Sequence, residues 1–151
     1  TLKTGEPGDM MIGTSMTEAD VQALMLWPHT NICTDGSLFD GHPRGAGSFP
    51  KVLAHYVRDL GRLSLEQAIY KMTGLPAEHM GLRERGKIAE GYIADLVLFD
   101  PATVIDHATT QAPHRLAEGV SAVWVAGQPV LQQGVSNDFF PGRVIRRASG
   151  D

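Results

Sequence analysis

The sequence contains one cysteine, Cys33, which excludes an internal disulfide framework. It has no apolar run near the roughly 20 residues that cross a bilayer, and its first residues lack the apolar core of a secretory signal. The net charge of −4 gives no reason to expect nucleic acid or a membrane surface as a partner. Together these absences predict a cytoplasmic protein.

The sequence also lacks the histidine motifs of common metal sites. None of its histidines forms a His-x-His pair or a His-Glu-x-x-His helix motif, whereas a zinc site usually needs three or four protein ligands held together. We therefore predict no complete metal site within this chain. The six histidines are His29, His42, His55, His79, His107 and His114.

What is present has the composition of an ordinary globular protein, with 151 residues, of which 42% are hydrophobic and 20% charged. Apolar strands are predicted at residues 9–13 and 31–34. Between them, Thr17 resembles a helix cap followed by acidic residues, and this helix should end before Pro28. Its predicted apolar face consists of Val21, Leu24, Met25 and Trp27.

The next helical segment has the clearest pattern, with apolar residues at helical spacing from Phe49 to Leu60. Pro50 suits a first helical turn and Gly61 a helix end. Ser64 should cap a further helix, with Gln67 at the capping-box position, and residues 74–76 (Gly-Leu-Pro) should close it. The order of strands and helices up to this point is typical of the end of an α/β barrel.

The pattern changes after residue 80. We predict a strand at 96–99, a hairpin from strands 120–125 and 129–131, and a last strand at 142–146. The expected organisation is therefore a helical part, residues 1–80, and a β-rich tail, residues 81–151.

Asp35 is the most informative single residue. It follows the apolar segment 31–34 and precedes Gly36. In α/β barrels the catalytic groups lie at the carboxyl ends of strands, where a carboxylate can act as a general base on a metal-bound water. The alternative is that Asp35 only closes a turn, as Asp-Gly pairs often do.

A second candidate is the loop that carries His42 and Arg44, because strand-to-helix loops form the rim of barrel active sites. The guanidinium of Arg44 could bind a substrate carboxylate through two hydrogen bonds. Alternatively, Arg44 is solvated or pairs with a nearby acid such as Asp40.

Several motifs in sequence order resemble the late part of N-acyl-D-amino-acid deacylases, a branch of the metal-dependent amidohydrolases. The branch is indicated by His42-Pro43-Arg44, while the segment 87–101 is similar to amidohydrolases broadly. The other matching segments are 34–36, 63–69, 72–73, 76–77, 81–82, 123–127 and 141–143.

This resemblance implies the last units of a (β/α)₈ barrel, followed by strands of the small β-domain of the amidohydrolase fold. It carries the family's catalytic aspartate onto Asp35 and places Ser15 and Met16 on the pocket rim. It also implies zinc in the complete enzyme, with ligands from earlier strands that have no counterpart here. The expected substrate is an N-acyl-D-amino acid, and this chain alone should be inactive.

Two alternatives stay open. The chain could be part of another amidohydrolase, such as a dihydroorotase or hydantoinase relative, or it could be a non-catalytic domain that associates with itself. The apolar face of the 49–60 helix must be buried against the chain's own β-rich tail or against another copy of the chain. We favour another copy, because the apolar strands would otherwise present unpaired edges, and so expect either a homo-oligomer or a missing N-terminal segment that covers them.

Overall fold

The computed structural model describes residues 13, 15–36 and 41–146. The predicted strand 9–13 lies outside these residues, except for Gly13, which is in no strand. All described helices precede residue 81 and all described strands follow residue 95. None of the helices in this part of the chain is long and apolar enough to cross a membrane.

Helix α1 (Glu18–Leu26) begins as predicted. Thr17 and Asp20 form a reciprocal capping box, in which each side chain bonds the backbone N–H of the other residue. The predicted apolar face is only partly correct, because Met25 is buried and Val21 packs on the core, but Leu24 and Trp27 are exposed. The face that points inward is therefore narrower than the sequence suggests.

The predicted 49–60 helix starts earlier than expected, as α2 (Arg44–Lys51), and continues as a π-helix, η1 (Val52–Asp59). Pro50 thus lies inside a helix and not in its first turn. Proline has no N–H to donate to the carbonyl four residues earlier. The backbone after it has the hydrogen bonds of a π-helix, between residues five positions apart, as when Leu60 N–H donates to the carbonyl of His55 at 2.9 Å. Gly61, with φ +57°, ends the segment as predicted.

Helix α3 (Leu65–Met72) has the predicted capping box between Ser64 and Gln67. This helix ends at Met72, two residues before Gly74, as predicted, but the sequence did not indicate the further helix, α4 (Gly74–Met80), that starts there. Pro76 lies in the first turn of α4, where its missing N–H has no helical partner to lose.

The strands form one antiparallel sheet in the order β1-β2-β3-β4, consisting of β1 (Leu96–Phe99), β2 (Val120–Val125), β3 (Gln128–Gln132) and β4 (Val135–Ser136). The predicted hairpin is confirmed. Its loop, Ala126-Gly127, has φ of 50° and 77°, so both residues are left-handed as a two-residue turn of type I′ requires.

A second loop of the same kind, Gln133-Gly134, joins β3 to β4. The predicted strand at 142–146 is wrong, because these residues form no strand. The last strand of the described part of the chain is β4, which the two-residue Gln133-Gly134 turn places directly beside β3.

The segment 31–34 is likewise not a strand. A strand needs a neighbouring strand to pair with its backbone, but Ile32 N–H donates to the carbonyl of Lys71, near the end of α3, at 3.0 Å. The segment therefore runs along the helical part of the molecule without a ladder partner among the described residues.

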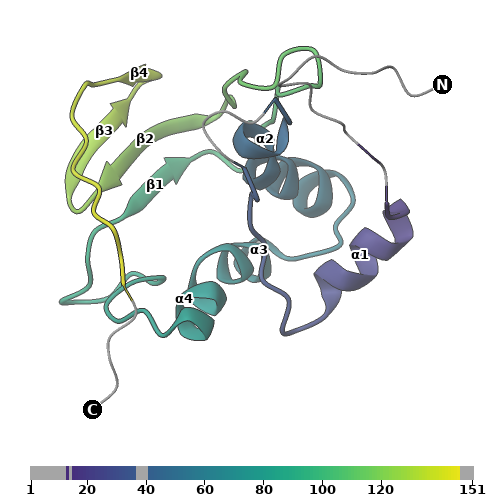
Figure 1. Ribbon diagram of the computed structural model, residues 1–151, viewed down its shortest axis with the longest axis horizontal. Helices are drawn as coiled ribbons and strands as arrows, with labels where there is room; N and C mark the ends of the chain where they lie inside the picture. The colour runs from purple at the N-terminus through teal and green to yellow at the C-terminus, as the bar shows by residue number, and fades with distance from the viewer. Residues whose placement is uncertain (1–12, 14, 37–40, 147–151) are drawn as a thin grey trace, which may run out of the picture.

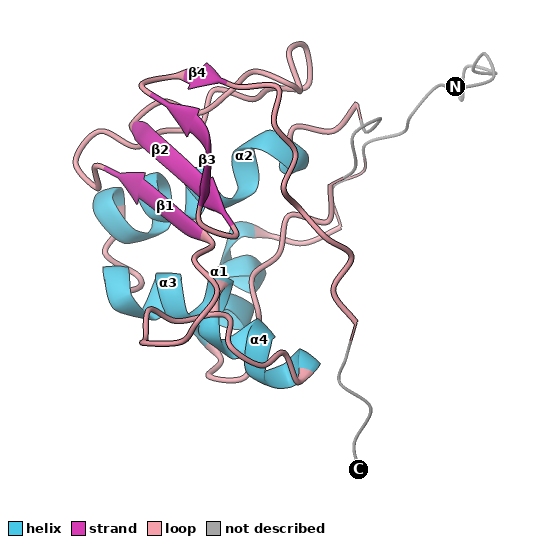
Figure 2. Cartoon of the chain, turned by 90° about the vertical axis from the view of Figure 1, so that its left-hand side faces the viewer, coloured by secondary structure: helices cyan, strands magenta, loops and turns pink. Residues whose placement is uncertain are grey.

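The core joins both parts of the chain. Met25, Val52, Leu53, Tyr56, Leu63 and Ala68 are buried around Val104, which is 1% exposed, and Phe99 of β1 packs against them. The apolar stripe of η1 is therefore buried inside one chain. Figures 1 and 2 show the resulting arrangement, with the sheet on one side of the helices.

Candidate functional site

Asp35 lies in the loop that precedes α2 and has a left-handed backbone conformation, with φ 47°. Aspartate tolerates this region better than most residues. Next to it, Gly36 N–H donates to Oγ1 of Thr34 at 3.3 Å. The side chain of Asp35 is 79% exposed, so its carboxylate is accessible to a substrate or water.

The carboxylate of Asp35 is paired with Arg44, the first residue of α2, whose Nη1 lies 3.1 Å from Oδ2. The side chain of Arg44 is 39% exposed, and a solvent-accessible pair of this kind contributes only about 0–1 kcal/mol to stability. Asp40, the alternative partner considered from sequence, lies outside the described residues. The structure thus brings two of the predicted site residues into direct contact.

The contact between the Asp35 loop and α2 depends on two glycines. A Cβ placed on Gly36 would lie 2.3 Å from the Cα of Gly45, too close for any side chain. The backbones therefore approach each other directly, and this brings the carboxylate of Asp35 within reach of the first turn of α2.

His42 supports the same turn. Its Nδ1 accepts a hydrogen bond from the backbone N–H of Arg44 at 3.0 Å. This bond needs Nδ1 as an acceptor, so in the neutral ring the proton is on Nε2. Its contact in the structure is thus with the backbone at the start of α2, beside the Asp35–Arg44 pair.

Ser15 and Met16 precede α1, and both are exposed. Within the described part of the chain, no hydrogen bond joins either residue to Asp35. Their predicted place on a pocket rim stays a prediction.

Two anchors in this region had not been identified from the sequence, and the first is Lys71. Its ammonium Nζ donates to the carbonyls of Trp27 and Thr30 at 2.5 and 3.3 Å, and its own carbonyl accepts from Ile32. The sequence did contain a signal, since Lys71 lies three residues after Ala68, which belongs to the apolar side of the predicted helix.

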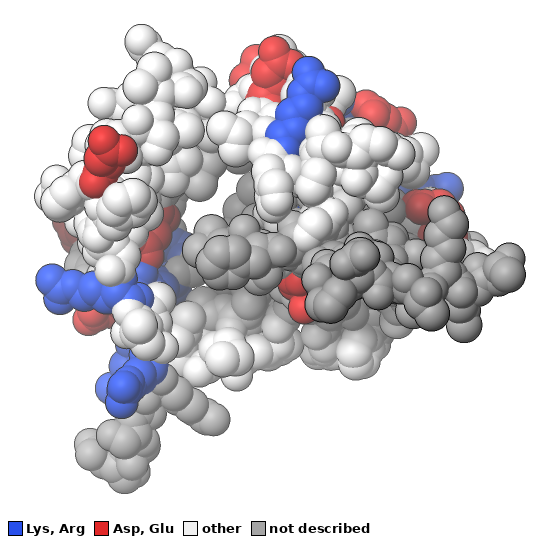
Figure 3. Space-filling view, turned by 45° about the horizontal axis from the view of Figure 1, so that its top comes forward, with Lys and Arg blue, Asp and Glu red and all other residues white. Residues whose placement is uncertain are grey.

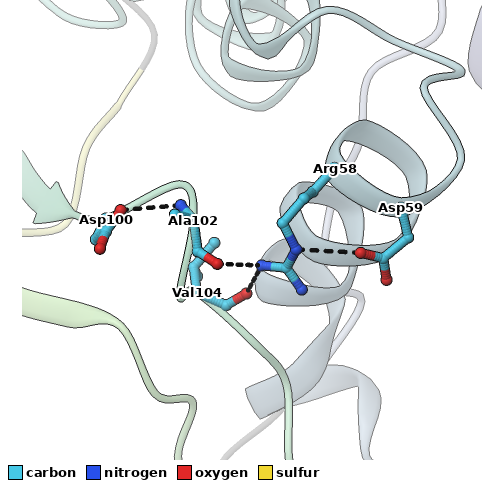
Figure 4. A network of polar contacts seen from close by, with 5 residues as sticks. All are labelled: Arg58, Asp59, Asp100, Ala102 and Val104. Carbon is cyan, nitrogen blue, oxygen red and sulfur yellow. Dashed lines mark hydrogen bonds and ion pairs between the residues drawn. The ribbon is translucent and has the colours of Figure 1, made fainter.

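The second anchor is Arg58, at the end of η1. Its Nη1 donates to the carbonyls of Val104 and Ala102 at 2.6 and 3.4 Å, and its Nε lies 3.1 Å from Oδ1 of Asp59 (Figure 4). In the turn that follows β1, Oδ1 of Asp100 accepts a hydrogen bond from Ala102 N–H at 2.9 Å. Arg58 thereby joins the helical part to the segment after β1.

A shallow surface hollow of about 350 Å³ lies beside this anchor. Its walls combine both charge signs with the apolar Ile105, and on the face drawn in Figure 3 the described basic and acidic side chains are also interspersed. The lining residues are Lys51, Ala54, His55, Arg58, Asp59, Ile105 and Asp106. The hollow has no contact with the Asp35–Arg44 pair.

The described residues do not form a metal centre. Nowhere among them do three or more histidine, cysteine, aspartate or glutamate side chains come together in an arrangement that could hold a metal ion. Cys33 is exposed. The site consists of an accessible carboxylate, a guanidinium beside it and a histidine two residues before the helix that carries the guanidinium, which suits proton transfer and anion binding.

Comparison with known proteins gives a consistent result. The model of the "Amidohydrolase family" matches residues 21–131. D-aminoacylase of Alcaligenes xylosoxydans xylosoxydans is 48% identical over 89% of this chain and 28% of its own length. N-acyl-D-aspartate deacylase of the same organism is 48% identical over 90% of this chain and 27% of its own length.

A solved structure of N-acyl-D-glutamate deacylase from Bordetella bronchiseptica, in complex with zinc and a phosphonate that mimics the tetrahedral reaction intermediate, has the same fold over this region. It superimposes with a TM-score of 0.78 at 39% identity, covering 87% of this chain and 28% of that one. The chain thus spans just over a quarter of the length of the relatives that it matches.

Proposed function

Since the chain belongs to the amidohydrolase family, we propose that it is the carboxy-terminal part of a zinc-dependent hydrolase of N-acyl-D-amino acids. This enzyme would cleave the amide bond to give a carboxylate and a free D-amino acid. The observation that carries the proposal is the 48% identity to D-aminoacylase over 89% of this chain, within which Asp35 presents an accessible carboxylate.

In this proposal Asp35 is the general acid and base. Its carboxylate takes a proton from the attacking water, the oxygen of that water bonds to the acyl carbon, and the C–N bond breaks as the proton passes to the leaving amine. The carboxylate is then regenerated. Its exposure and its position at the end of segment 31–34 give it the access that these transfers need.

Arg44 and His42 would form the substrate-binding side of the site. An N-acyl-D-amino acid carries an α-carboxylate, and a guanidinium is the side chain best suited to bind it through two hydrogen bonds. The Asp35 carboxylate now occupies this position on Arg44. A bound substrate would compete for the guanidinium and release Asp35 for proton transfer, while Ser15 and Met16 would lie on the rim.

Zinc does not fit the described residues, because they contain no group of three or more suitable ligands. If the complete enzyme uses zinc, its ligands come from the remainder of the protein, and this chain alone should neither hold the metal nor hydrolyse substrate.

The proposed architecture follows from the same assignment. Residues 1–80 would supply the last units of a (β/α)₈ barrel, and residues 81–151 would contribute strands to a small β-domain. The chain would function in the cytoplasm. A homo-oligomer stays a prediction, although one reason for it is gone, because Leu53 and Tyr56 of η1 are buried within a single chain.

Assays on the full-length protein that contains this chain would test the proposal. We expect zinc-dependent release of D-amino acids from N-acyl-D substrates, no turnover of the L-enantiomers, and none of dihydroorotate or hydantoins. The isolated chain, after dialysis, should retain no stoichiometric zinc. Turnover of the cyclic amides alone would favour the second candidate, a dihydroorotase or hydantoinase relative.

A non-catalytic, self-associating domain predicts a different result. The purified full-length protein would then show no hydrolysis with any of these substrates, and sedimentation would show a defined oligomer whose mass does not depend on zinc.

A further inference from the structure

Lys71 is the one polar or charged residue that is buried among those described, with 6% of its surface exposed. It lies on the inner face of α3, three residues after Ala68, the other buried residue of this helix. Burying a charged side chain is costly unless hydrogen bonds replace the lost water. Its position therefore calls for an explanation.

The lost water is replaced by main-chain carbonyls of one segment. Nζ donates to Trp27 at 2.5 Å and to Thr30 at 3.3 Å, and no carboxylate pairs with it among the described residues. Burial lowers the pKa of Lys71 from its ordinary value. These carbonyls follow the end of α1, where the helix dipole is negative and a cation is favoured.

A third bond ties the same segment to the same residue, because Ile32 N–H donates to the Lys71 carbonyl at 3.0 Å. Residues 27–32 are thus attached to α3 through both the side chain and the main chain of Lys71. Three residues further on is Asp35, whose loop is held from the opposite side by the close approach of Gly36 to Gly45 and whose carboxylate, before a substrate binds, pairs with Arg44.

We propose that Lys71 is a positioning residue for Asp35, acting through the carbonyls of Trp27 and Thr30 that its buried ammonium binds. This proposal rests on the proposed role of Asp35 as the proton-transferring group. Lys71 does not contact the site itself. It fixes one end of a short segment whose other end is fixed by α2, so that the carboxylate is presented in one orientation.

Lys71→Met in the full-length protein tests this assignment, because methionine keeps most of the side-chain volume and removes the donors. We expect kcat to fall at least about tenfold while KM stays within about twofold, since misplacement of a catalytic group slows the chemical step. Backbone amide exchange should become at least about tenfold faster in residues 30–36 and stay unchanged in β2. Lys87→Met, at an exposed lysine, is the matched control and should leave kcat, KM and amide exchange unchanged.

Lys71→Arg distinguishes positioning of Asp35 from a general effect on the stability of the fold, because arginine can donate to the same carbonyls. It should keep slow exchange in residues 30–36 and most of kcat. A second readout is a double-mutant cycle: in an Asp35→Asn background, Lys71→Met should cause little further loss, because the group that it positions is already inactive.

Several outcomes would overturn the assignment. In the kinetics, these are an unchanged kcat in Lys71→Met, equal losses of kcat in Lys71→Met and Lys71→Arg, or additive losses of kcat in the double-mutant cycle. In the structural measurements, they are faster exchange throughout β2 or unfolding of Lys71→Met. A wild-type protein without deacylase activity would instead refute the proposed function. The exchange experiment would still measure whether Lys71 holds residues 30–36.

Discussion

The guanidinium Nη1 of Arg44 lies 3.1 Å from the carboxylate Oδ2 of Asp35, so the first residue of α2 is paired with the residue that follows segment 31–34. The pair is exposed and contributes little to folding. In the proposed function the pair matters chemically, because Asp35 would accept a proton beside the guanidinium that would bind the substrate carboxylate.

Asp35→Asn in the full-length protein should lower kcat at least about 100-fold, because a positioned acid or base typically contributes 10²- to 10⁴-fold. Asparagine also tolerates the left-handed conformation at φ 47°, so the fold should be retained. Steady-state kinetics and circular dichroism would check both expectations. Asp59→Asn is the matched control, since Asp59 also pairs with an arginine at 3.1 Å, and should have near-normal turnover. Near-normal turnover in Asp35→Asn would refute the assignment.

Arg44→Met should mainly raise KM. Loss of a charge-assisted hydrogen bond to the substrate carboxylate costs about 1.5–3 kcal/mol, which corresponds to roughly a 10- to 100-fold weaker interaction. The unfolding free energy should change by less than about 1 kcal/mol, because the ion pair with Asp35 is exposed. Kinetics with an N-acyl-D-amino acid and with the corresponding N-acyl amine, which lacks the carboxylate, would test this. The effect should be confined to the first substrate and absent in Arg62→Met.

Gly36→Ala should destabilise the loop that carries Asp35. The new Cβ would lie 2.3 Å from the Cα of Gly45, and relieving such an overlap typically costs about 1–3 kcal/mol. Urea unfolding of the wild type and the variant gives the difference. Gly41→Ala, where a Cβ meets nothing within 4 Å, is the control. Equal stability of the two variants would show that the loop can move away from α2 at no cost.

Arg58→Met should lower the unfolding free energy by about 1–3 kcal/mol, because it leaves the carbonyl of the buried Val104 without its donor at 2.6 Å. Thermal or urea unfolding would measure the loss. Arg62→Met, at an exposed arginine, serves again as the comparison and should change stability by less than about 0.5 kcal/mol. A neutral Arg58→Met would mean that water replaces the guanidinium.

Tyr56 should make stability depend on alkaline pH. Burial, with a further contribution from the hydrogen bond to Glu18, raises the pKa of its phenol from 10.0 to about 12. The folded state therefore holds the proton more tightly than the unfolded state. The resulting stabilisation is present below pH 10 and is lost as pH rises through about 12. The stability difference between the wild type and Tyr56→Phe should shrink over this range, as urea unfolding at a series of pH values would show. A constant difference would contradict the raised pKa.

The sequence predicted best those features whose physical cause is local. The helix cap at Thr17 and the capping box at Ser64 depend on residues three positions apart, and the Ala126-Gly127 loop supplies its own left-handed residues. Segment 31–34 could not be predicted in this way. Its apolar residues are compatible with a strand, but whether a strand forms depends on which distant backbone lies beside it, and in this structure that is the end of α3.

In the site too, the residues could be predicted from the local sequence, but the contact between them could not. Asp35 and Arg44 were recognised as candidates, but their contact depends on Gly36 lying against Gly45, which no spacing in the sequence indicates. The π-helix η1 was missed because its apolar pattern differs little from that of an α-helix over two turns. Lys71 was overlooked because a lysine on an apolar face is normally interpreted as a solvated residue.

The two tight hairpin loops have a consequence for the order of folding. Strands β2, β3 and β4 are joined by loops of two residues each, so their pairing closes very short stretches of chain and can form within microseconds. The bond from Arg58 to Val104 instead closes 46 positions, at a larger entropic cost. We therefore expect the β2–β4 meander to form before the helices dock onto Val104.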